Sequence, residues 1–245
     1  MAAEMTINDL VARLRDGAGM NLVSVVLYGS AAGGDYVPEL SDTNLLCVLR
    51  DTSFGELKKI APAVEAWTKG KHRTPLLMGV EELKAAADVF SIELLDMQQS
   101  YKVLWGEDVL STLVIPTRFH RVQLEYELRE KTILLRQGLI ASEGQAQRMW
   151  ELLLRSVPGF ATLFRHALVE LGEPPAASKR ESVQKLAAKL GFEMSAFLQL
   201  LDVREHKADP TRTDVSNLFA RYLKEVEHVT SAVDRMLDSP PAGRA

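Results

Sequence analysis

Two apolar stretches of strand length, separated by a short loop, constrain the fold of this chain more than any other feature. The first stretch covers residues 22–30 and the second covers residues 41–49, and both are rich in Val and Leu. The loop between them holds Gly33, Gly34 and Pro38. Apolar runs that flank a turn-rich loop are typical of neighbouring strands in a buried sheet. The chain is therefore predicted to fold around a mostly buried sheet.

Polar residues stand where these two strands end and begin. Gly29 allows a sharp turn after the first strand, and the exposed amides of that turn, with the Ser30 hydroxyl, could cradle a phosphate. Asp42 opens the second strand, and Asn44 shares its face because residues two apart in a strand point to the same side. A polar pair beside a phosphate-binding turn is what metal-assisted phosphoryl transfer requires.

The order Gly29-Ser30, residues 31–41 and Asp42-Thr43-Asn44 resembles the nucleotidyltransferase superfamily of the DNA-polymerase-β type. The signature of that superfamily is an apolar strand, Gly-Ser, a similar spacing and then Asp-x-Asp or Asp-x-Glu in a second strand. The resemblance implies nucleotide contacts from Gly29, Ser30 and Ser41, and catalytic, Mg²⁺-binding roles for Asp42 and Asn44. Asn44 stands where the superfamily has its second carboxylate, so the charge of the site falls and weaker Mg²⁺ binding is expected.

The third acid of such a site is expected on a later strand. Residues 90–97 are predicted to form that strand, because residues 92–97 run apolar, acidic, apolar, apolar, acidic, apolar, as such strands of the resembled superfamily commonly do. The resemblance places Glu93 in the catalytic and metal-binding position, with a further role as general base, and Asp96 is the alternative. In a strand these two acids point to opposite faces, so only one of them can join Asp42.

Strand signals end near Pro116, and helical patterns follow. Helices are predicted over residues 118–139, 145–157, 159–171, 179–190, 194–203 and 215–237. The predicted fold class is thus an α/β (α+β) nucleotidyltransferase-fold N-terminal domain, residues 1–116, joined to a C-terminal all-α helical bundle, residues 117–238. Residues 239–245 are predicted to form a disordered tail. This layout looks like that of the aminoglycoside nucleotidyltransferases.

Composition narrows the classes of partner and the cellular compartment that are expected for this chain. The formal net charge of −4 over 245 residues gives no sign of a strongly cationic surface and argues against a nucleic-acid or membrane partner. A single cysteine, Cys47, excludes an intrachain disulfide and is predicted to be buried. No targeting segment or long apolar run is present, so a cytoplasmic protein is expected.

The resemblance implies transfer of a nucleoside monophosphate from an NTP, with ATP expected, to a hydroxyl of a small molecule or protein. The alternative is a non-catalytic nucleotide-sensing or partner-binding module that kept the fold, and Asn44 favours this alternative. Whether the chain forms a homodimer stays open. Arg221 and His228 could share a helix face and resemble the Arg-and-His pair of helical-bundle ribonucleases, with a solvated helix face as the simpler interpretation.

Overall fold

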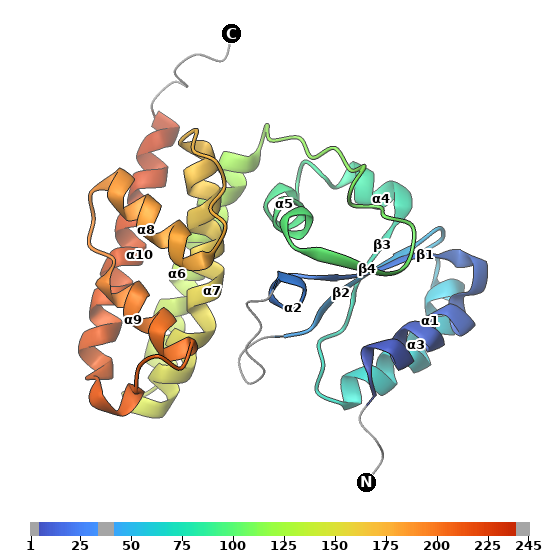
Figure 1. Ribbon diagram of the computed structural model, residues 1–245, viewed down its shortest axis with the longest axis horizontal. Helices are drawn as coiled ribbons and strands as arrows, with labels where there is room; N and C mark the ends of the chain where they lie inside the picture. Colours follow the sequence, from blue (N-terminus) through green and yellow to red (C-terminus); the bar gives the residue numbers. More distant parts are fainter. Residues whose placement is uncertain (1–4, 34–41, 239–245) are drawn as a thin grey trace. The chain divides into compact units, whose positions relative to one another are not determined.

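The structure is a computed structural model, and it describes residues 5–33 and 42–238 (Figure 1). The chain divides into two compact units, Met1–Thr117 and Arg118–Ala245. Among the described residues, no helix has both the length and the apolar content needed to cross a bilayer.

The first unit alternates helices and strands. Its elements are α1 (Ile7–Ala18), a 3₁₀ turn (Gly19–Asn21), β1 (Leu22–Tyr28), α2 (Ser30–Gly33), β2 (Asn44–Leu49), α3 (Phe54–Lys69), β3 (Leu76–Gly79), α4 (Val80–Ala85), α5 (Ser91–Gln99) and β4 (Tyr101–Gly106).

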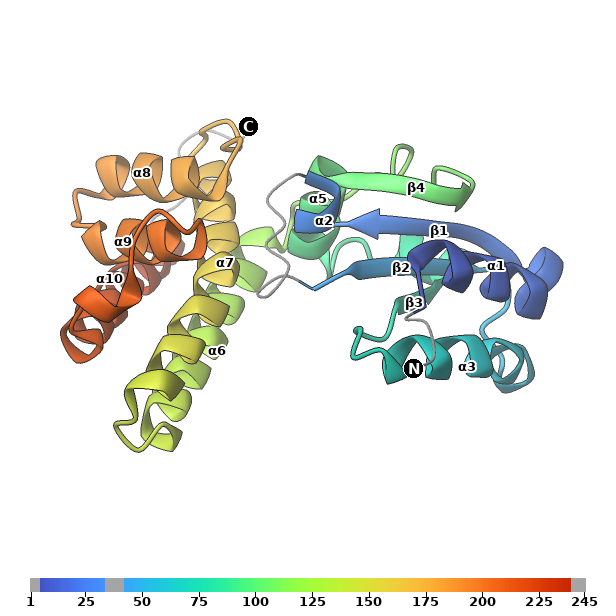
Figure 2. The same cartoon turned by 60° about the horizontal axis from the view of Figure 1, so that its bottom comes forward.

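The four strands form one mixed sheet in the order β3-β2-β1-β4, which Figure 2 shows from the side. β1 pairs antiparallel with both β2 and β4, whereas β3 runs parallel to β2. The antiparallel register places Tyr28 opposite both Asn44 and Tyr101. The two predicted strands are thus direct neighbours, and the end of β1 meets the beginning of β2.

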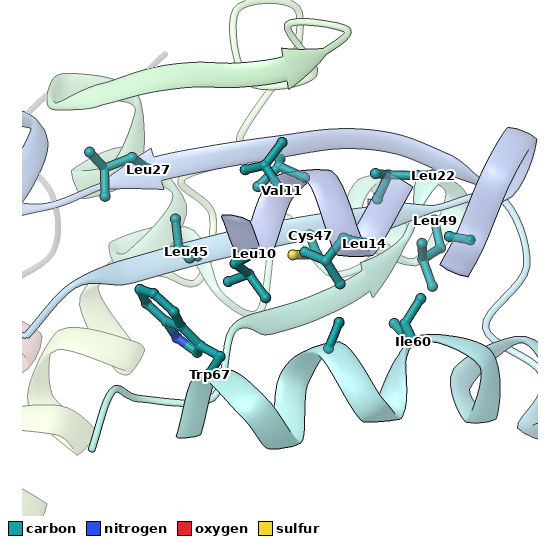
Figure 3. Close-up of a cluster of buried hydrophobic side chains, with 13 residues drawn as sticks. Leu10, Val11, Leu14, Leu22, Leu27, Leu45, Cys47, Leu49, Ile60 and Trp67 are labelled. Atoms are coloured by element: carbon teal, nitrogen blue, oxygen red, sulfur yellow. The ribbon is translucent and has the colours of Figure 1, made fainter. Parts of the chain in front are cut away.

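Helices cover both faces of the sheet. On one face, α1 and α3 contribute an apolar core that packs on alternate residues of β1 and β2 (Figure 3), including Leu10, Leu14, Ile60, Trp67, Leu45, Cys47 and Leu49. Cys47 is buried in this core, as predicted. On the other face, α4 and α5 contribute Leu83, Leu94 and Met97 to a second core with Leu46 and Val48. Tyr28 packs against this second core.

The predicted strand over residues 90–97 is wrong, because this segment forms the helix α5. Its buried side chains are Ser91, Ile92, Leu94 and Met97, and the spacing of three between the last two follows a helical face. Phe90, Ile92 and Leu94 lie two residues apart and also fit a strand, so over this short stretch the pattern alone could not separate the two. The strand of this region is β4, which begins after α5 at Tyr101.

The second unit is built from helices, with no strand in residues 118–238. It contains α6 (His120–Ala141), α7 (Ala146–Glu170), α8 (Lys179–Leu190), α9 (Ser195–Arg204), a 3₁₀ turn (Pro210–Arg212) and α10 (Val215–Asp238). α6 and α10 run antiparallel, because Arg129 pairs with Asp234 at 2.8 Å while Arg136 pairs with Glu227 at 2.7 Å.

The two helices predicted over residues 145–157 and 159–171 are a single helix, α7, which continues through Pro158. Proline has no N–H, so the carbonyl of Leu154, four residues earlier, loses its partner in the helix. The guanidinium of Arg204 on α9 donates to this Leu154 carbonyl. A buried side chain from another helix therefore satisfies the group that Pro158 leaves unpaired in α7, and the helix does not end there.

Candidate functional site

The turn after β1 has the geometry that the sequence predicts for it. Gly29 has φ +76°, in the left-handed region that a residue with a side chain rarely adopts. Its N–H donates to the Ser100 carbonyl at 3.0 Å, and the Ser100 hydroxyl donates back to the Gly29 carbonyl at 3.1 Å. Ser30 follows as the first residue of the short helix α2. The turn is therefore fixed by Ser100, the residue before β4, for which the sequence predicted no role.

Asn44 lies against this turn. It is the first residue of β2 and stands opposite Tyr28 in the register. A Cβ atom added to Gly29 would come within 3.4 Å of the Asn44 Nδ2 atom. The sheet thus brings together Gly29 and Asn44, two of the residues that the sequence assigns to the site.

Asp42 lies just before β2, and the guanidinium of Arg73 lies beside it. The Arg73 Nη1 atom lies 3.5 Å from the Asp42 Oδ2 atom, and the two side chains are 66% and 61% exposed. Arg73 comes from the segment before β3, which is brought to this place because β3 runs parallel to β2. This long-range pairing carries no local sequence signal, which is why Arg73 was not among the predicted site residues.

A cavity of about 300 Å³ opens at this edge of the sheet. It is lined by Tyr28, Asn44 and Leu45 from the first two strands and by Arg73 and residues 74–76. A guanidinium, a phenol and an amide thus line one hollow beside the Gly29 turn. Such a set of donors suits an anionic or polar ligand.

Glu93 lies on α5, the helix that covers the same face of the sheet as Tyr28. Burial raises the pKa of the Tyr28 phenol, the positive charge of Arg73 opposes this rise, and the negative charge of Glu93 adds to it. The charge of Glu93 therefore reaches Tyr28. Because Glu93 lies on a helix, the alternation of faces in a strand cannot decide between Glu93 and Asp96. These two acids are three residues apart on α5, so the predicted opposition of their faces does not hold.

The remaining predicted residues are Ser41 and the pair Arg221 and His228. Ser41 lies outside the described residues. Arg221 donates to Asn217, Ser195 and Gln199, and the His228 ring stacks on Phe192 with ring centroids 5.2 Å apart. Each member of the predicted Arg-and-His pair thus has a structural partner in the bundle.

The described side chains at this edge include few carboxylates that could hold Mg²⁺. Within residues 5–33 and 42–238, no three His, Cys, Asp or Glu side chains come together as a metal site. Asp42, the carboxylate next to β2, already has the Arg73 guanidinium beside it, and Asn44 brings no charge. Mg²⁺ gives up its waters reluctantly and is usually held by carboxylates together with phosphates. Asp42 and Asn44 by themselves therefore offer less negative charge than a site of that kind uses.

Comparisons with known proteins bear on the fold. No protein-family model and no curated protein sequence matches this chain. Among solved structures, it is similar to spectinomycin adenyltransferase AAD(9) from Enterococcus faecialis, crystallised with ATP and spectinomycin. The TM-score is 0.55 at 14% sequence identity, over 90% of this chain and 98% of that one. This likeness confirms the predicted fold class, a nucleotidyltransferase fold followed by a helical C-terminal part.

Proposed function

We propose that this chain is a nucleotidyltransferase-like protein that binds ATP at the Gly29 turn and slowly transfers its nucleoside monophosphate to a hydroxyl of a small molecule. The observation that carries the proposal is the cavity beside Gly29, where Asn44, Arg73 and Tyr28 meet. The likeness to an adenyltransferase crystallised with ATP and spectinomycin supports both the nucleotide and the class of acceptor.

Each predicted residue has a role in this proposal. Ser30 and Ser41 donate to the phosphates, because hydroxyls and backbone amides are donors suited to phosphate oxygens. Gly29, whose own N–H is bonded to the Ser100 carbonyl, lets the phosphates approach the turn closely because it has no side chain. Asp42 and Asn44 offer Mg²⁺ one charged and one neutral oxygen ligand, which makes a weak metal site. Glu93 is the carboxylate that we assign as general base, since its charge already reaches Tyr28 beside the turn.

The proposed reaction is a single displacement at phosphorus. The acceptor oxygen forms a bond to the α-phosphorus, the bond from that phosphorus to the oxygen bridging to the β-phosphorus breaks, and pyrophosphate leaves. The hydroxyl proton passes to Glu93. Catalysis of this reaction depends on positive charge placed against the phosphates. Because the donor set is poor for Mg²⁺, slow turnover is expected.

The second candidate is a nucleotide-sensing or partner-binding module without catalysis. The Asp42–Arg73 ion pair favours it, because a guanidinium beside the first carboxylate opposes metal binding at that carboxylate. The two candidates share the nucleotide site and differ in whether pyrophosphate is released.

Calorimetry with the full chain tests the shared claim. ATP should bind more tightly than adenosine, since the turn engages the phosphates. Amide shifts of Tyr28, Gly29 and Asn44 should change in a two-dimensional NMR spectrum when ATP is added. Equal affinities for ATP and adenosine, or shifts confined to other elements, would contradict the proposal. A pyrophosphate-release assay with spectinomycin and other hydroxyl-bearing small molecules then separates slow transfer from none.

A further inference from the structure

We propose that Arg73 binds the nucleotide phosphates directly and supplies the positive charge that a metal ion would otherwise provide, so that nucleotide binding does not require a divalent cation. The inference rests on the proposed function, because it takes the cavity beside Gly29 as the nucleotide site. It goes beyond that function by naming the residue that holds the phosphates and by removing Mg²⁺ from the binding step.

The position of Arg73 suits this role. Its side chain lines the same cavity as Tyr28 and Asn44, and Asn44 in turn lies against the Gly29 turn. The side chain is 66% exposed, so the guanidinium is open to a ligand from solution. A guanidinium presents a planar set of donors that can bind two phosphate oxygens at once.

The backbone that carries Arg73 is anchored in the core. The Trp67 indole N–H donates to the Arg73 carbonyl at 2.9 Å, and Trp67 itself is buried. The His72 ring stacks on Trp67, with ring centroids 3.7 Å apart. Pro75 follows two residues later and restricts the chain further. Arg73 therefore projects from a fixed point, although its guanidinium is exposed.

The charges at this edge favour phosphate over metal. Asp42 and Glu93 each contribute one negative charge, Arg73 contributes one positive charge and Asn44 contributes none, so these four side chains carry a net charge of −1. A group of side chains with so small a net charge has little attraction for a divalent cation. The ion pair between Arg73 and Asp42 is solvent-exposed and therefore weak. An incoming phosphate can thus replace Asp42 as the partner of the Arg73 guanidinium with little loss of free energy.

The test is calorimetry with ATP and with inorganic triphosphate on the full chain, in EDTA and in excess Mg²⁺. The ATP dissociation constant in EDTA should be within about twofold of the value in Mg²⁺. Arg73→Ala should weaken ATP binding about tenfold or more in EDTA, and Arg73→Lys should recover part of the loss because it restores a charge without the planar donors.

Arg50→Ala is the matched control. Arg50 follows the other end of β2, is 64% exposed and forms a comparable ion pair with Glu107 at 3.7 Å. Its loss should leave ATP binding unchanged, and thermal unfolding checks that every variant folds.

Binding that needs Mg²⁺ and is unaffected by Arg73→Ala would overturn the inference and leave the proposed function standing. Binding of inorganic triphosphate that depends on Arg73, with no gain from the adenosine part, would support the inference and contradict a nucleotide-specific function. If neither ligand binds in either condition, both are overturned.

Discussion

Gly29 and Ser100 exchange two hydrogen bonds, from the Gly29 N–H to the Ser100 carbonyl at 3.0 Å and from the Ser100 hydroxyl to the Gly29 carbonyl at 3.1 Å. The pair joins the end of β1 to the residue that precedes β4. It fixes the turn at the point where the phosphates of a nucleotide are proposed to bind. The conformation of the turn therefore depends on a contact across the sheet as well as on glycine.

Gly29→Ala should destabilise the protein by roughly 1–2 kcal/mol, because a left-handed φ strains any residue with a Cβ atom. The added carbon would also stand 3.4 Å from the Asn44 amide nitrogen. Urea denaturation measures the change. Gly55→Ala is the control, since Gly55 lies in α3 with open space around it, and this variant should be neutral or slightly more stable. Equal effects at both positions would contradict the strain argument.

A double-mutant cycle tests the contact that lets α7 continue through Pro158. Arg204→Met should cost roughly 2 kcal/mol, because it leaves the Leu154 carbonyl buried without a donor. In a Pro158→Ala background the loss should be smaller by about 1 kcal/mol, since the substituted alanine could donate its own N–H to the Leu154 carbonyl. Urea denaturation of the four proteins gives the coupling energy. A coupling energy of zero would mean that Arg204 does not compensate for Pro158.

The stability of the helical unit should depend on Glu225. This side chain is 6% exposed and accepts hydrogen bonds from the N–H groups of Ala196 and Phe197 at 3.0 and 3.1 Å. Burial raises the pKa of Glu225 to about 7, and the two N–H groups only partly oppose the rise. Between its ordinary pKa of 4.5 and about 7, the folded state keeps a proton that the unfolded state has released. The free energy of unfolding therefore falls as the pH rises through this window.

Glu225→Gln removes the titration and nearly preserves the shape of the side chain. Relative to the natural chain, it should gain on the order of 3 kcal/mol of stability as the pH rises from 4.5 to about 7. His166, whose pKa burial lowers to about 3, titrates equally in both proteins and cancels in the difference. Denaturant unfolding across the window measures the two curves, and parallel curves would show that Glu225 is not the titrating group.

Asn44→Asp should make nucleotide binding depend on metal. The change restores a carboxylate where the resembled superfamily has one, and a second charged oxygen is what Mg²⁺ or Mn²⁺ requires. ATP should bind at least about tenfold more tightly in Mn²⁺ than in EDTA for this variant, while the natural chain shows little difference. Adding Asp42→Asn should abolish the gain. Weaker ATP binding in Mn²⁺ after Asn44→Asp would instead indicate that Asn44 is adapted to the natural ligand.

Local pattern was enough to predict the part of the fold around Gly29. The apolar runs on either side of it, with their glycine-rich loop, indicated neighbouring strands, and helical periodicity indicated α6 and α8–α10. The pattern failed where a short segment fits two periods, as at Glu93 on α5. It also failed at Pro158, because the Arg204 guanidinium, which is distant in the sequence, bonds the Leu154 carbonyl that the proline leaves unpaired. Arg73 and Ser100 reach the site only through strand pairing, which leaves no trace in the local sequence.

The central claim is that the edge of the sheet at Gly29 and Arg73 binds a triphosphate without a metal ion. A crystal structure of the full chain soaked with ATP and MnCl₂ tests it most directly, because manganese is visible by its anomalous scattering. The account predicts triphosphate density at the Gly29 turn in contact with the Arg73 guanidinium, and no manganese peak between Asp42 and Asn44. A manganese peak at that place, or ATP bound away from this edge of the sheet, would contradict it.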